Sequence, residues 1–109
     1  MTAFDVTEIS ELDQILRKYP GKVILVDFAA KWCGPCKRIA PIIHDLNTKY
    51  DFVLVKVDVD EADDLSDKYK VRSMPTFMFF KDNQHITTLK GAGPQVVNAI
   101  QKMCPLRKS

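Results

Sequence analysis

Residues 27–37 read Asp27-Phe-Ala-Ala-Lys-Trp-Cys-Gly-Pro-Cys-Lys37 and join an apolar run to an amphipathic segment. The run Val23-Ile-Leu-Val-Asp-Phe28 is apolar apart from one acid, which is typical of a strand covered on both faces and favours a parallel sheet. After the Gly34-Pro35 step, apolar residues at three- and four-residue intervals predict a helix to about Tyr50. They are Ile39, Ile42, Ile43, Leu46 and Tyr50. The two cysteines therefore follow a buried strand and open a helix, where open α/β folds place their sites.

Outward from this stretch, strands and helices alternate. Apolar runs predict further strands at residues 4–6, 52–57, 76–80 and 86–89, and spacing and caps predict further helices from Ser10 to the Pro20-Gly21 pair, at 61–69 and at 94–103. Ser10-Glu-Leu-Asp13 resembles a capping box for the first of these helices. The linker 81–85 is too short for a parallel crossover and predicts a hairpin. The order β-α-β-α-β-α-β-β-α predicts an α/β fold, with a mixed sheet of about five strands between four helices.

Composition limits the class of protein. The chain has 109 residues, 46% of them apolar, and a net charge of +2, which predicts a single domain spanning 1–109. Charges of both signs are scattered, so we expect neither nucleic acid nor a membrane surface as a partner. The N-terminus lacks the features of a secretory signal and no apolar run is long enough for a membrane span. We therefore expect a cytoplasmic protein in which resting thiols are free and any disulfide is functional.

The pair Cys33 and Cys36 predicts redox chemistry. Cys33 lies at a helix N-terminus, where free N–H groups and the helix dipole favour a nucleophilic thiolate, and Cys36 follows one turn later. Half of a zinc site is an alternative, but the remaining ligands Cys104, His44 and His85 contain no second pair, and structural zinc normally takes four ligands. Two inert core cysteines are a second alternative. The neighbouring Trp, Gly and Pro argue against it because they indicate an exposed turn.

Four segments together resemble the thioredoxin family. They are Asp27–Lys37, Pro41, Met74-Pro75-Thr76-Phe77 and Gly91-Ala92, in the same order and spacing over essentially the whole chain. The resemblance implies the thioredoxin fold and a general protein-disulfide reductase that carries electrons on a dithiol.

The resemblance also implies a reaction sequence. Cys33 would attack a client disulfide, Cys36 would displace the client thiol, and the resulting Cys33–Cys36 disulfide would be reduced by a flavin-containing thioredoxin reductase with electrons from NADPH. It implies no bound cofactor and no metal, and clients such as peroxiredoxins. A tethered second thiol at high effective concentration is consistent with this sequence.

Asp27 is the acid within the buried strand. Burial without a partner raises the proton affinity of a carboxylate, which suits the general base for Cys36 that the family implies; a solvated acid at the strand end is the alternative. Lys56 matches a position where bacterial thioredoxins place a lysine facing the buried acid. It is expected either to partner Asp27 or to be a surface lysine.

The resemblance implies a client-binding surface. Met74-Pro75 resembles the family's cis-proline turn, whose backbone pairs with an extended client peptide by strand addition. The expected contact residues are Trp32, Gly34, Pro35, Met74, Pro75, Gly91 and Ala92.

Cys104 is the odd cysteine. It is expected to be either a part-buried structural residue or a regulatory thiol able to link two chains; we expect a monomer, with a Cys104-linked dimer as the alternative. Two other activities remain open. An oxidase or isomerase would be favoured by Cys-Gly-His-Cys and a secretory route, and a redox-dependent binding module would hold a partner enzyme.

Overall fold

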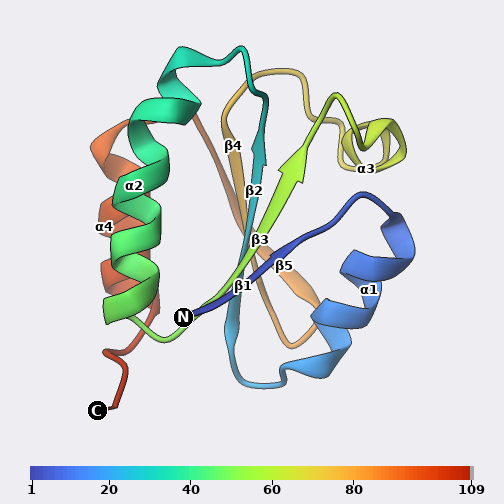
Figure 1. Ribbon diagram of the computed structural model, residues 1–109. Coiled ribbons are helices and arrows are strands. Elements are labelled where there is room, and N and C mark those ends of the chain that lie inside the picture. The colour runs from blue at the N-terminus through green and yellow to red at the C-terminus, as the bar shows by residue number, and fades with distance from the viewer. Residues whose placement is uncertain (109) are drawn as a thin grey trace.

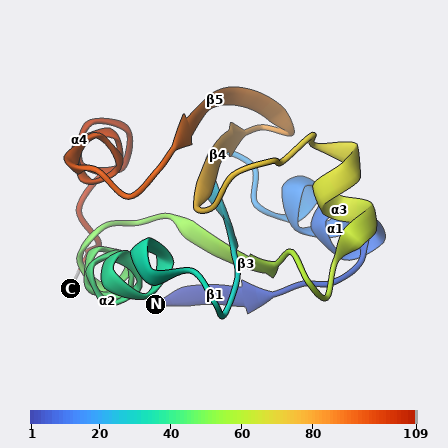
Figure 2. The ribbon, with the colours of Figure 1, turned by 90° about the horizontal axis from the view of Figure 1, so that it is seen from above.

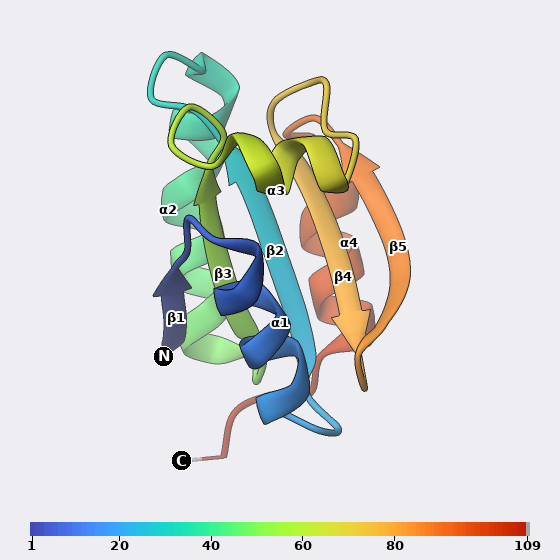
Figure 3. The ribbon, with the colours of Figure 1, turned by 90° about the vertical axis from the view of Figure 1, so that its right-hand side faces the viewer.

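A computed structural model describes residues 1–108. Its five strands form one sheet in the order β1-β3-β2-β4-β5. The strands are β1 (Thr2–Asp5), β2 (Val23–Ala29), β3 (Val53–Asp58), β4 (Thr76–Lys81) and β5 (Gln84–Lys90). β3 pairs in parallel with β1 and β2, whereas β4 pairs antiparallel with β2 and β5. The predicted mixed sheet is confirmed (Figure 3).

Within residues 1–108, four helices cover the two faces of the sheet. They are α1 (Ile9–Lys18), α2 (Gly34–Lys49), α3 (Asp63–Lys68) and α4 (Pro94–Met103). α2 and α4 lie on one face, and α1 and α3 lie on the other (Figures 1 and 2). The predicted order of elements is confirmed, with ends that differ by a few residues.

β2 explains why the central strand is continuously apolar. Val23 and Leu25 pack in the core cluster of α2 and α4, whereas Ile24, Val26 and Phe28 pack in the cluster under α1 and α3. Successive side chains of a strand point to opposite faces. A strand with a hydrophobic layer on each side therefore has no exposed face for polar residues, and Asp27 is an exception that needs a separate explanation.

The hairpin between β4 and β5 is tighter than predicted. Both strands extend into the expected linker, which leaves Asp82 and Asn83 as the turn. Their φ angles are +51° and +63°, as a type I′ two-residue turn requires. Asn and Asp tolerate this left-handed conformation better than most residues.

Two local predictions are wrong. The side chain of Glu11, rather than that of Asp13, closes the start of α1 by accepting hydrogen bonds from the backbone of Thr7 and Glu8, at 3.0 and 2.9 Å. The helix begins one residue earlier than Ser10, so the cap moves back as well. Ile42 is exposed, because Ile39, Ile43 and Leu46 form the stripe of α2 that meets the sheet and Ile42 lies at its edge.

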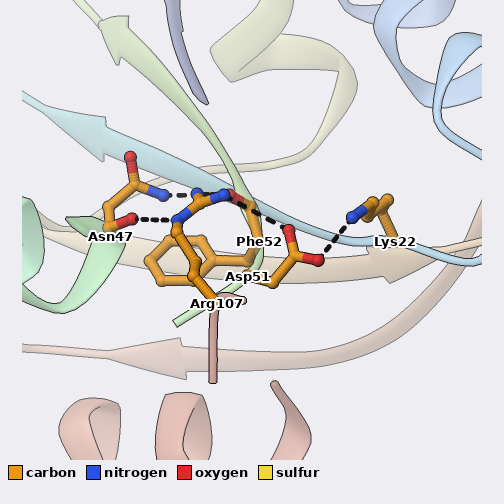
Figure 4. Close-up of polar contacts among 5 residues, drawn as sticks. All are labelled: Lys22, Asn47, Asp51, Phe52 and Arg107. Carbon is orange, nitrogen blue, oxygen red and sulfur yellow. Dashed lines mark hydrogen bonds and ion pairs between the residues drawn. The ribbon is translucent and has the colours of Figure 1, made fainter. Parts of the chain in front are cut away.

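Arg107 joins a polar cluster at the C-terminus of α2 (Figure 4). Arg107 donates from Nε to the carbonyl oxygen of Asn47 at 2.7 Å and from Nη2 to that of Phe52 at 2.9 Å. Its Nη1 lies 3.3 Å from Oδ1 of Asp51, whose other oxygen pairs with Lys22. The guanidinium thus satisfies a carbonyl that the end of the helix leaves free. No sequence pattern predicts this cluster.

No helix within residues 1–108 has the length and apolar character needed to cross a membrane.

Candidate active site

Cys33 and Cys36 form a disulfide at the start of α2, with their Cα atoms 5.3 Å apart. Cys33 is the N-cap residue, and its Sγ accepts a hydrogen bond from the backbone N–H of Cys36 at 3.2 Å. Pro35 occupies the first turn, where its missing N–H has no helical partner to lose. The N–H and the positive end of the helix both favour negative charge on the Cys33 sulfur when the pair is reduced.

The cysteines are more buried than the sequence suggested. Trp32 and Gly34 are exposed as expected, but Cys33 and Cys36 are only 4% and 6% exposed. Their side chains turn toward Ala30, and Val59 and Met74 pack against them. The expectation of an exposed turn is therefore right for Trp32 and Gly34 and wrong for the two cysteines.

Three loops at the same end of the sheet surround the disulfide. The Met74-Pro75 peptide is cis, Met74 contacts the cysteine cluster, and Gly91 donates its N–H to the carbonyl of Pro75 at 2.9 Å. The structure thus brings the three expected contact segments together: Trp32, the Met74-Pro75 turn and the Gly91 loop. Pro75 itself is buried, so it supports the surface from below.

Trp32 has a partner that the sequence did not reveal. Its Nε1 donates to Oδ2 of Asp60 at 3.0 Å, and beside it Lys31 pairs with Glu61 at 3.5 Å. Asp60 and Glu61 lie between β3 and α3, so this acidic loop orients the exposed indole. These acids lie far from Trp32 and Lys31 in the sequence, and only the fold brings the two segments together.

Asp27 lies on β2 and lines the same pocket as Cys36. It is 8% exposed, and among the described residues its Oδ1 has no hydrogen-bond partner. Burial raises the pKa of Asp27 to about 7, and the charge of Lys56 acts in the opposite direction. Asp27 and Cys36 both line a pocket of about 250 Å³ that opens to solvent between α2 and β3. Asp27 is thus a buried acid close to Cys36, rather than a solvated one.

Comparison with known proteins agrees with this geometry. A family profile described as "Thioredoxin" matches residues 4–102. The chain belongs to the thioredoxin family. Thioredoxin-1 of Caenorhabditis elegans is 49% identical over 83 residues, which are 75% of this chain and 72% of the nematode protein.

Solved structures of thioredoxins have the same fold. Reduced thioredoxin pre-protein of Schistosoma mansoni is 37% identical, with a TM-score of 0.87 over 94% of this chain and 98% of that one. Another similar chain comes from work on the thiol resolving mechanism in yeast mitochondrial 1-Cys peroxiredoxin via glutathione/thioredoxin systems. It is 31% identical, with a TM-score of 0.79 over 93% of this chain and 95% of that one.

Thioredoxins are thiol-disulfide oxidoreductases, and Trp32-Cys-Gly-Pro-Cys36 supplies the pair of thiols. The protein is a dithiol reductase of disulfides, as the sequence predicted. Within residues 1–108, no three His, Cys, Asp or Glu side chains gather closely enough to hold a metal ion.

Lys56 lies beside Asp27 in the sheet but forms no ion pair with it among residues 1–108. It is the register partner of Asp27 on β2, and its charge lowers the pKa of that acid. Its Nζ, however, lies 3.8 Å from Oδ1 of Asp5 on β1. Lys56 therefore pairs with the acid on the edge strand.

Cys104 lies just after α4 and is buried in the cluster between α4 and the sheet. Burial, together with the charge of Asp51, raises the pKa of its thiol to about 11. Both observations favour the structural alternative, because a buried neutral thiol is a poor nucleophile.

Proposed function

We propose that this thioredoxin reduces client disulfides by a two-step exchange in which Cys33 attacks and Cys36 resolves. The observation that carries the proposal is the asymmetry of the pair. The Cys33 sulfur receives an N–H at the end of α2, whereas Cys36 lines the pocket that also holds Asp27. The first environment favours a thiolate nucleophile, and the second supplies a proton acceptor.

The exchange balances in electrons and protons. The Cys33 thiolate attacks one client sulfur, the client S–S bond breaks, and the other client sulfur leaves as a thiolate that takes up a proton. The Cys36 thiolate then attacks the Cys33 sulfur, the mixed disulfide breaks, and the second client sulfur leaves as a thiolate that also takes up a proton. The client gains two electrons, and the enzyme is left with the Cys33–Cys36 disulfide.

Asp27 takes the proton of Cys36 in the second step. A pKa of about 7 places the carboxylate near the value at which a general base works best at neutral pH. Its Oδ1, which has no hydrogen-bond partner within residues 1–108, accepts the proton directly or through water in the pocket. Lys56 modulates this acid through its charge.

Clients bind over the disulfide at the end of the sheet. The exposed ring of Trp32 and the partly exposed residues Pro35, Met74, Gly91 and Ala92 form a contact surface for an extended peptide. Backbone pairing at Met74 recognises shape rather than sequence, which is consistent with a general reductase.

The electrons come from NADPH through thioredoxin reductase, and the protein transfers them to clients that include peroxiredoxins. Family membership supports this chain of electron transport, as does the similarity to the chain from the yeast peroxiredoxin work. We further propose that the protein acts as a single domain and as a monomer in the cytoplasm, where reducing conditions return the pair to dithiols. The burial of Cys104 supports a monomer rather than a Cys104-linked dimer.

Reduction of insulin disulfides with thioredoxin reductase and NADPH tests the proposal. We expect rapid reduction by the wild type, none by Cys33→Ser, and accumulation of a covalent client complex by Cys36→Ser. Turnover by Cys33→Ser would contradict the role of Cys33. Full binding of a partner by that variant, with no wild-type turnover, would support the alternative of a binding module.

A further inference from the structure

Three charged residues form a row across neighbouring strands. In register, Asp5 of β1 lies beside Lys56 of β3, and Lys56 lies beside Asp27 of β2. Side chains at matched register positions point to the same face of a sheet. All three line the pocket that also contains Cys36. The row therefore alternates in charge, from the acidic Asp5 on the edge strand through the basic side chain of Lys56 to the buried carboxyl of Asp27.

Exposure changes along this row. The side chain of Asp5 is 84% exposed and that of Lys56 is 37% exposed, whereas Asp27 is 8% exposed. The Lys56 ammonium lies 3.8 Å from the outer acid, Asp5, and makes no ion pair within 4.0 Å with the inner acid among residues 1–108. Asp27 consequently keeps one oxygen that has no hydrogen-bond partner in the described part of the chain, although a cation lies on the next strand.

We infer that Asp5 is a positioning residue that holds the Lys56 ammonium toward the sheet edge and so keeps Asp27 able to take up the Cys36 proton near neutral pH. The inference rests on the proposed role of Asp27. A lysine paired directly with Asp27 would stabilise its carboxylate and make it a weaker base. Asp5 prevents this by offering Lys56 a solvated partner.

Asp5 acts on Asp27 through Lys56 rather than through the other charged groups near Asp27 or directly. From α2, Cys36 and Lys37 line the pocket, and Lys31 does so from the preceding loop; from β3, Asp58 joins Lys56. From β4, the register partner of Asp27 is the uncharged Phe77. Asp5 is two strands from Asp27, about 10 Å at ordinary strand spacing, so solvent and salt screen their direct interaction.

Titration of Asp27 by carboxyl carbon NMR in the oxidised protein tests the inference. In Asp5→Asn we expect the Asp27 midpoint to fall by about half a pH unit, the scale of one exposed ion pair. The pH profile of mixed-disulfide resolution should shift down equally, because freed Lys56 stabilises the ionised form. Asp5→Glu should restore both midpoints, and Asp64→Asn, an equal charge change on α3, should move neither.

A double-mutant comparison isolates Lys56. In a Lys56→Met background, Asp5→Asn should leave the Asp27 midpoint almost unchanged. An equal shift with and without Lys56 would show that Asp5 acts through space and would overturn the inference, as would an unchanged midpoint in Asp5→Asn alone.

The proposed function fails separately. If Asp27→Asn leaves the resolution rate unchanged, Asp27 is not the base, and the catalytic half of the inference fails with it. If Asp27→Asn slows resolution and Asp5→Asn moves no midpoint, only the inference is wrong.

Discussion

Replacing Asp27 with asparagine is expected to stabilise the oxidised protein at pH 8, and to raise its free energy of unfolding relative to the wild type by more at pH 8 than at pH 5. Asp27 is buried and its Oδ1 has no hydrogen-bond partner among the described residues, so folding removes a carboxylate from water without a matching contact. In the folded protein the pKa of Asp27 is therefore about 7, against 3.8 for a free carboxyl, so the carboxyl stays protonated to a higher pH than in the unfolded chain. Asparagine carries no charge at any of these pH values.

The size of the effect follows from linkage. Between pH 3.8 and about 7 the folded state binds more protons at Asp27 than the unfolded state does, so the free energy of unfolding falls as pH rises. At about 1.4 kcal/mol for each pKa unit, the loss is about 1.7 kcal/mol at pH 5 and about 4 kcal/mol at pH 8. An unpaired amide in the same place costs about 1–3 kcal/mol at either pH, and this contribution cancels when the two pH values are compared.

Urea unfolding of the oxidised wild type and of Asp27→Asn at pH 5 and pH 8 measures this difference. The advantage of the variant should be about 2.5 kcal/mol larger at pH 8 than at pH 5. Asp64→Asn, which removes an exposed acid from α3, serves as the control and should show no comparable pH dependence. Equal advantages for Asp27→Asn at the two pH values would refute the argument that burial holds the proton on Asp27.

Three further predictions follow from contacts elsewhere. Arg107→Ala should lower the free energy of unfolding by about 1–3 kcal/mol, because it leaves two carbonyls and Asp51 without the guanidinium. The control Lys108→Ala should change it by less than about 0.5 kcal/mol, and equal losses in the two variants would disprove the anchoring role of Arg107. Cys104 should resist alkylation in the native protein and react fully in urea, since it is buried, and fast native labelling would count against this. Trp32→Ala should raise KM for a protein client about ten-fold, with a smaller effect for a small disulfide, because the exposed indole contacts only large clients; equal effects on both substrates would place its role elsewhere.

Local patterns were enough to predict the order of elements and the position of the redox pair. The apolar run of β2 and the amphipathic spacing of α2 each depend on residues within one element, and the cysteines lie where the two join. The family resemblance then indicated Asp27, the Met74-Pro75 turn and the Gly91 loop. The structure places these segments around one disulfide.

Contacts between distant segments could not be predicted in this way. Trp32 meets Asp60 across 28 positions and Arg107 meets Phe52 across 55, and neither pair belongs to a periodic pattern. The row of Asp5, Lys56 and Asp27 exists only because β3 lies between β1 and β2, and the sequence does not state strand order. The burial of the cysteines likewise depends on Val59 and Met74, which come from other loops.

Alkylation of the fully reduced protein tests whether Cys33 is the thiolate nucleophile. Iodoacetamide labelling over a range of pH, with the modified cysteine identified by peptide mass mapping, reports which sulfur is the thiolate. We predict that Cys33 is labelled first and reaches half its maximal rate well below pH 8.5, the value typical of a free thiol, while Cys36 and Cys104 remain largely unlabelled. Labelling of Cys36 before Cys33, or of Cys33 with the pH dependence of free cysteine, would contradict the account.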